Sequence, residues 1–152
     1  MASKTIVVGY DGSKEAKAAL HVAIGLAQDA PGSKIVIACG HDRQPGWLGY
    51  EPLWEAAIHM QKAWDEMEGR IAEDLEEAAK MVREAGVEAA TACSRGNPAS
   101  IVVTVARETD AEMIVVGTKG AGGTETTTVV GSTTQELLHT SHVPVLVVPS
   151  DR

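Results

Sequence analysis

Runs of β-branched and aliphatic residues alternate along this chain with stretches of helical periodicity. Most of the runs are apolar at consecutive positions, the pattern of strands that are buried on both faces of a parallel sheet. The third run is weaker because it consists mostly of Ala and Thr. The five predicted strands cover residues 5–10, 34–39, 88–93, 113–116 and 143–148.

Helical periodicity between these runs predicts four helices, over about residues 13–29, about 55–85, from 98 onward and over about 132–139. Ser13 and Asn97 are placed to cap the first and third helices, and Pro98 then occupies a favoured first helical position. Gly86 is a natural residue to follow the second helix. The sequence from Ser132 to Gln135 fits a capping box for the fourth.

Strand and helix alternate from one end of the chain to the other, and no linker, low-complexity tract or internal repeat interrupts them. Right-handed connections between parallel strands then place helices on both faces of one open sheet. We therefore predict the α/β fold class, with residues 1–152 forming a single domain around an open five-stranded parallel sheet.

Composition narrows the range of functions. The 152 residues include 44% hydrophobic residues and carry a formal net charge of −8, which argues against a nucleic-acid partner. Charged residues, Gly and Pro interrupt every apolar stretch before it reaches the length of a membrane span. The N-terminus leads directly into the first predicted strand without a signal sequence. Cys39 and Cys93 lie inside apolar runs, where we expect buried thiols and no disulfide or metal site. These observations favour a cytoplasmic location.

Glycine is concentrated after the fourth predicted strand, at the edge of the sheet where ligands of such folds bind. Gly117 and Gly120 come first, and Gly131 and Ser132 stand at the start of the last helix. Glycines let successive backbone amides surround an anion, and a helix N-terminus favours a phosphate. With Lys119 as an additional positive charge, the sequence predicts a site for a phosphate-bearing ligand.

The standard nucleotide fingerprints are absent. The first predicted strand is followed by Gly9-Tyr10-Asp11-Gly12, which matches neither the P-loop pattern nor the G-x-G-x-x-G pattern of dinucleotide-binding folds. A P-loop NTPase and a dinucleotide dehydrogenase are therefore disfavoured.

The glycines resemble the pattern G-2x-G-9x-G-[ST] of the ATP-binding branch of the universal stress protein family. Gly117, Gly120, Gly131 and Ser132 occupy its fixed positions, and the opening strand, Gly96-Asn97-Pro98 and the closing strand extend the likeness over nearly the whole chain.

One departure from the family pattern concerns the spacing of the glycines. Ten residues separate Gly120 from Gly131, where the family has nine. The extra residue is either absorbed as a wider loop or shifts the amides and weakens triphosphate binding.

The resemblance implies the strand order 3-2-1-4-5 of Rossmann-like, adenine nucleotide alpha hydrolase-like folds. It also implies ATP as the ligand, with AMP as the alternative and Mg²⁺ as a companion of ATP. Asp11 would contact the adenosine and Gly40 the adenine edge. Gly117 and Gly120 would face the ribose and phosphates, while Gly131 and Ser132 would face the phosphates. A homodimer through the last strand, from Val143 to Val148, follows from the same likeness.

Each of these positions also has a purely structural interpretation. Asp11 can form an Asx turn at the start of the first helix, and Gly40 and Gly117 can serve tight turns alone. The segment 41–64 holds Trp47, Trp54 and Trp64. We expect these rings to pack and seal the sheet, and the alternative is a flap over the ligand or a partner-binding surface.

The leading interpretation is a homodimeric, cytoplasmic stress-response protein whose nucleotide occupancy changes its interactions with a protein partner. No hydrolytic machinery is identifiable, so an evolved enzyme activity is disfavoured. The first alternative is an interaction module of the same family that binds no ATP or prefers AMP. The second is an ATP pyrophosphatase-like enzyme, although the S-G-G-x-D-S motif of that class is missing after the first strand.

Overall fold

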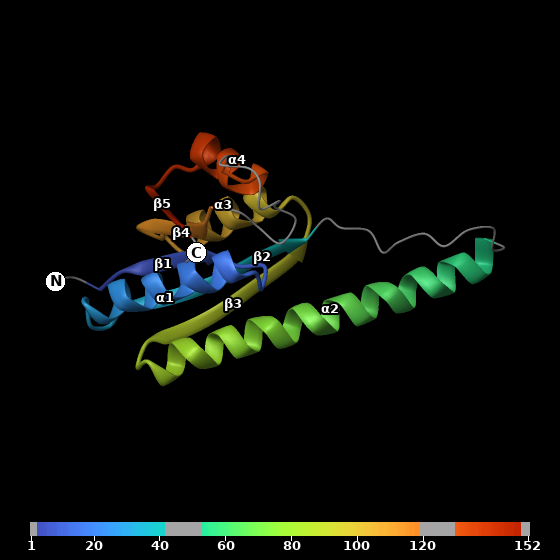
Figure 1. The fold of residues 1–152 in the computed structure, drawn as a ribbon, viewed down its shortest axis with the longest axis horizontal. Helices are drawn as coiled ribbons and strands as arrows, with labels where there is room; N and C mark the ends of the chain where they lie inside the picture. The colour runs from blue at the N-terminus through green and yellow to red at the C-terminus, as the bar shows by residue number, and fades with distance from the viewer. Residues whose placement is uncertain (1–2, 42–52, 119–129, 150–152) are drawn as a thin grey trace.

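The computed structural model describes residues 3–41, 53–118 and 130–149, and strands and helices alternate through it as predicted (Figure 1). The elements in chain order are β1 (Thr5–Gly9), α1 (Lys14–Gln28), β2 (Lys34–His41), α2 (Leu53–Glu84), β3 (Glu88–Arg95), α3 (Pro98–Glu108), β4 (Met113–Gly117), α4 (Ser132–Thr140) and β5 (Val145–Val148).

The five strands form one parallel sheet in the order β3-β2-β1-β4-β5, which confirms the predicted fold class and strand order. β1 lies at the centre, where Val7 pairs with Val36 of β2 on one side and Ile114 of β4 on the other. The chain therefore reverses its direction of winding between β1 and β4, the place where ligands bind in open α/β sheets.

Two apolar cores cover the two faces of the sheet. α1 and α2 pack on one face, where Leu20 and Val82 meet Ile6 and its neighbours. α3 and α4 pack on the other, where Leu137 lies in one cluster with the β-sheet valines. The helices stand in the same two layers in Figure 1. Because these side chains are aliphatic and fully buried, hydrophobic burial supplies most of the stability.

Local sequence signals set most helix ends. The Ser13 hydroxyl accepts a hydrogen bond from the Ala16 amide at 3.1 Å, and the Asn97 side chain accepts one from the Ser100 amide at 2.9 Å. Gly86 follows α2 with φ of +80°, a conformation that suits glycine. The predicted capping box of the last helix is wrong. Gly131 is the N-cap of α4 and contributes no side-chain cap bond.

The edge strand β3 departs from the expected burial. It is hydrogen-bonded to β2 alone within the described sheet, and five of its eight residues are exposed. Cys93 is one of these exposed residues. The expectation of two buried thiols is therefore correct for Cys39 and wrong for Cys93, because an edge strand has a neighbour on one side only.

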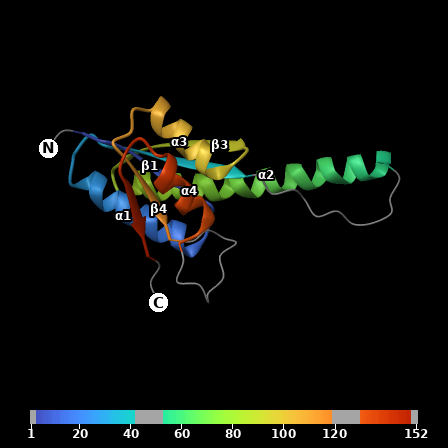
Figure 2. The same cartoon turned by 90° about the horizontal axis from the view of Figure 1, so that it is seen from above.

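α2 is long enough to pass the end of the sheet. Its 32 residues span about 48 Å at 1.5 Å per residue, and its N-terminal part extends beyond the other elements (Figure 2). Trp54 and Ile58 on this part are 65% and 60% exposed. The expectation that the tryptophans seal the sheet is wrong for Trp54, while Trp47 lies outside the described residues.

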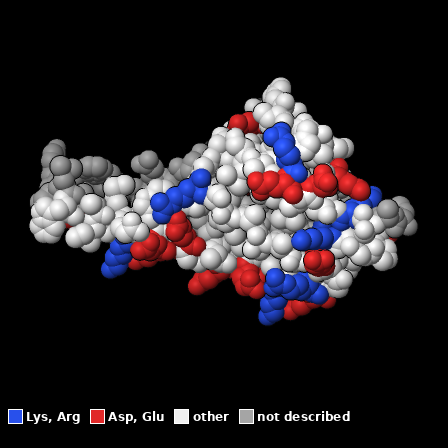
Figure 3. All heavy atoms as spheres, turned by 180° about the vertical axis from the view of Figure 1, so that it is seen from behind, with Lys and Arg blue, Asp and Glu red and all other residues white. Residues whose placement is uncertain are grey.

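The solvent face of α2 is rich in charged side chains. Acidic and basic side chains are interspersed along the side of the molecule where this helix lies (Figure 3). Ion pairs such as Lys80–Glu84 at 3.9 Å connect successive turns of the helix, as expected for a solvated helix face. In the described part of the chain, no helix is long and apolar enough to cross a membrane.

Replacing Asn97 with Ala tests the cap of α3. The Ser100 amide then loses its acceptor, so we expect the free energy of unfolding to fall by about 1 kcal/mol, measured by urea denaturation. Asn97→Ser is the matched control because it keeps a capping oxygen, and it should stay close to wild type. Equal losses in both variants would contradict the assignment of the cap.

Candidate functional site

The carboxyl end of β1 is held by backbone bonds and a short turn. The Tyr10 amide donates to the Ala38 carbonyl of β2 at 2.9 Å. The Asp11 carboxylate then accepts a bond from the Ser13 amide at 2.9 Å, which is the Asx turn of the structural interpretation. Asp11 thus lies at the strand exit, as predicted. Its contact with adenosine stays a prediction.

Tyr10 is buried near carboxylates of α2. Burial of the phenol is the main cause that raises the pKa of Tyr10, and the charges of Asp74, Glu77 and Asp11 raise it further. Asp74 also closes on the turn after β1, since a Cβ added to Gly12 would lie 3.1 Å from its Oδ2. The phenol therefore stays protonated at neutral pH, and this side of the turn is acidic.

Three hydrogen bonds, which we call the β4–α4 clasp, hold the exit of β4: two join it to the start of α4 and one joins it to β5. The Gly131 amide donates to the Thr118 carbonyl at 2.7 Å, and the Thr118 amide donates to the Val148 carbonyl of β5 at 3.1 Å. The buried Thr134 hydroxyl donates to the Gly117 carbonyl at 2.8 Å. The clasp brings Gly117 and Gly131 together, as the pattern predicted, despite the longer spacer. Gly120 lies outside the described residues.

The clasp decides which amides at the start of α4 can meet an anion. The Gly131 amide is already bonded to Thr118, so a phosphate would contact the amides that follow it. Those of Ser132 and Thr133 belong to the first turn of the helix, where amides lack an intrahelical acceptor. Gly131 has no side chain with which to cap them. The helix dipole adds partial positive charge at this point.

Two of the predicted site glycines are required by packing. A Cβ at Gly117 would lie 2.6 Å from Glu15 Cβ and 2.7 Å from the Glu15 carbonyl carbon. A Cβ at Gly40 would lie 2.7 Å from Pro98 Cα. The strand ends therefore approach the starts of α1 and α3 closely. This packing is reason enough for both glycines, and their contacts with a nucleotide stay predictions.

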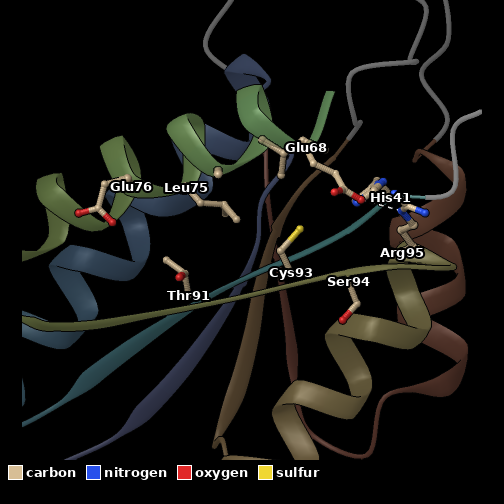
Figure 4. Close-up of a pocket in the computed structure, with 10 residues that line it drawn as sticks. His41, Glu68, Leu75, Glu76, Thr91, Cys93, Ser94 and Arg95 are labelled. Atoms are coloured by element: carbon tan, nitrogen blue, oxygen red, sulfur yellow. Dashed lines mark hydrogen bonds and ion pairs between the residues drawn. The ribbon is translucent and has the colours of Figure 1, made fainter. Parts of the chain in front are cut away.

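A pocket of about 510 Å³ opens elsewhere, between α2 and the edge strand β3 (Figure 4). At one end of it Arg95 Nε bonds Glu68 Oε1 at 2.6 Å, and the Arg95 guanidinium lies 4.2 Å above the Trp64 ring. His41 stacks at an angle against the same ring, with centroids 6.0 Å apart. The buried Nδ1 atom of His41 has no hydrogen-bond partner among the described residues.

Sequence reasoning missed this cluster and the role of Thr134. His41, Trp64 and Arg95 come from three elements. His41 follows a predicted strand and Trp64 was expected to pack, but nothing in the sequence marked Arg95 as their neighbour. Thr134 was hidden in a run of hydroxyl residues that looked like a helix cap. No group of His, Cys, Asp and Glu in the described residues could hold a metal ion.

Comparisons with known proteins find relatives over nearly the whole chain. The model of the universal stress protein family matches residues 2–149. A universal stress protein of Thermus aquaticus, named for its place in the QAH/OAS sulfhydrylase 3′ region, is 33% identical over 150 residues, which cover 95% of this chain and 98% of that protein.

Solved structures share the fold over the full length. The hypothetical protein MJ0577 superposes with a TM-score of 0.81 at 18% identity, over 100% of this chain and 99% of that one. A universal stress protein in complex with cAMP gives a TM-score of 0.67 at 25% identity, over 99% and 100% of the two chains.

Gly117→Ala tests the close approach of β4 to α1. The new methyl group would overlap backbone atoms of Glu15, which no side-chain rotation can relieve, so we expect a loss of about 1–3 kcal/mol or more in the free energy of unfolding. Gly25→Ala is the matched control. Gly25 lies in α1 with nothing within 4 Å of its added Cβ, so that variant should gain about 0.5–1 kcal/mol. A Gly117→Ala protein as stable as wild type would refute the packing requirement.

Proposed function

The chain belongs to the universal stress protein family, and we propose that it binds an adenine nucleotide at the carboxyl ends of β1 and β4. Nucleotide occupancy then changes how a homodimer interacts with a protein partner in the stress response. Support comes from a structural neighbour solved with cAMP and from the strand order, which reverses at this place.

The observation that carries the proposal is the uncapped start of α4 beside the β4–α4 clasp. Ser13 and Asn97 satisfy first-turn amides of α1 and α3 with their own side chains, whereas the N-cap of α4 is a glycine without a side-chain bond. A phosphate can supply the acceptors that α4 lacks. The adenosine would then extend towards Asp11 and Gly40 at the ends of β1 and β2.

We propose ATP as the ligand, with AMP as the alternative and Mg²⁺ accompanying ATP. The clasp supports this phosphate position despite the longer spacer, because the Gly131 amide bonds the Thr118 carbonyl with the extra residue present. The α2 carboxylates Asp74 and Glu77 belong to the helix that packs on the face of the sheet opposite α4. Repulsion between carboxylates and phosphates is thereby reduced.

Ser132→Pro tests the amide that the phosphate would meet. Proline removes this amide but is favoured at the first helical position, and Gly131, with φ of −60° and ψ of 159°, already has a conformation that a following proline allows. We expect an unchanged melting temperature. Affinity for ATP in isothermal calorimetry should fall about tenfold to a hundredfold, the effect of one bond to a charged group.

Ser132→Ala is the matched control, because it removes the hydroxyl and keeps the amide, and it should bind nearly as well as wild type. Adenosine, AMP, ADP and ATP are then compared on the wild type. Binding of adenosine as tight as ATP would refute a phosphate site at α4. No binding of any nucleotide at millimolar concentration would favour the interaction-module alternative, and pyrophosphate release would favour the enzyme alternative.

We also propose that the homodimer forms through β5. This strand is at the sheet edge, bonded to β4 alone within the described sheet, and its sequence is Val-Leu-Val-Val without a charged residue. Leu146 is 36% exposed. An uncovered apolar edge strand invites pairing with another strand, and a second copy would cover it. The cytoplasmic location stays a prediction.

Leu146→Asp tests this interface. A buried, unpaired carboxylate at the centre of a paired edge is costly, so we expect the dimer to dissociate in analytical ultracentrifugation. Val22→Asp is the matched control, because Val22 is similarly exposed, at 37%, but lies on α1. Dissociation by both variants, or by neither, would contradict an interface at β5.

A further inference from the structure

Cys39 and Cys93 occupy paired positions on neighbouring strands. Cys39 of β2 is the direct partner of Cys93 of β3 in the parallel register. Residues paired in this way point to the same face of the sheet, here the face covered by α2. Neighbouring strands lie about 4.7–4.9 Å apart, which is inside the range of about 4.4–6.8 Å that the Cα atoms of a disulfide require.

The two thiols differ in accessibility. Cys39 is 7% exposed and belongs to the core below α1 and α2, whereas Cys93 is exposed. The Cys93 sulfur points towards α2, into the pocket that Leu75 and Glu68 border from the helix side (Figure 4). A small reagent can therefore reach Cys93 through the pocket, whose lining does not include the buried Cys39.

The thiols already interact. Burial is the main cause that raises the pKa of Cys39, to about 12, and it also raises the pKa of Cys93. The neighbouring Cys93 thiol raises the pKa of Cys39 further, whereas the Cys39 thiol acts in the opposite direction on the pKa of Cys93. Both groups are thus protonated at neutral pH, and Cys93 is the better nucleophile of the two.

We propose that Cys39 and Cys93 form a reversible disulfide site, which small-molecule disulfides oxidise through the pocket between α2 and β3. In the first step the Cys93 thiolate attacks one sulfur of the reagent, the reagent S–S bond breaks and one reagent thiolate leaves. In the second step the Cys39 thiolate attacks Cys93 Sγ, and the other reagent thiolate leaves. The two protein sulfurs are oxidised, the two reagent sulfurs are reduced, and the two cysteine protons pass to the departing thiolates.

The place of β3 in the sheet favours closure of this bond. As an edge strand it is hydrogen-bonded to β2 alone within the described sheet, so a small shift towards β2 breaks no contact with a further strand. The bond would join β2 and β3 one residue before Gly40, which is packed against Pro98 of α3. Oxidation would therefore fix the edge strand next to the carboxyl end of the sheet.

The test treats the reduced protein with 2-hydroxyethyl disulfide, a small neutral reagent, and quenches with acid before intact-mass and peptide analysis. The expected product is a monomer that has lost two hydrogens, with the Cys39 and Cys93 peptides linked. Its rate of formation should rise about tenfold for each pH unit above neutrality, because the thiolate is the reacting form. Dithiothreitol should restore the starting mass.

Single variants separate the two steps. Cys39→Ala should stop at a mixed disulfide on Cys93, whereas Cys93→Ala should stay unmodified while folded, because the remaining thiol is buried. A wild-type protein that stops at the mixed disulfide, or that forms only disulfides between two chains, would overturn the proposal. The wild-type experiment tests whether the Cys39–Cys93 disulfide forms even where a variant fails to fold.

Discussion

The arrangement at the carboxyl edge of the sheet depends on two places where a strand end approaches a helix start without room for a side chain. Gly117 of β4 lies against Glu15 of α1, and Gly40 of β2 lies against Pro98 of α3. These contacts come from opposite faces of the sheet. Because backbone atoms line both of them, they fix where α1 and α3 begin relative to the ends of β4 and β2.

The parallel topology gathers helix N-termini at the same edge of an acidic protein. Every helix that connects parallel strands starts at the carboxyl ends, so α1, α3 and α4 bring their positive dipole ends to the same edge. The net charge of −8 would otherwise repel a phosphate. Amides in contact with the phosphate can outweigh this repulsion, because salt screens the interaction of the phosphate with charges more than about 10 Å away.

The sequence predicted the strand order, the two helical layers and the caps at Ser13 and Asn97, since each depends on local pattern or on the family resemblance. It failed where contacts between elements decide. The cap of α4 moves to Gly131 because the Thr134 hydroxyl is drawn to the Gly117 carbonyl and the Gly131 amide to Thr118. A capping box read from four residues cannot include partners on β4.

Exposure was mispredicted for a related reason. The third strand was predicted with Cys93 buried inside an apolar run, but an edge strand lacks the second neighbour that would have covered Cys93. Trp54 was expected to pack because large rings usually do. The periodicity that defines α2 says where an apolar stripe runs, and it says nothing of where the sheet beneath that stripe ends.

The two edges of the sheet differ in a way that directs assembly. β3 is flanked by charge, with Lys34 paired to Glu88 at 3.8 Å and Arg95 paired to Glu68, and charged groups at an edge oppose pairing with another strand. β5 carries aliphatic residues only. A second copy therefore has reason to add at β5 and not at β3. An assembly built in this way leaves the β3 edge, its pocket and the paired thiols open to solvent in each subunit.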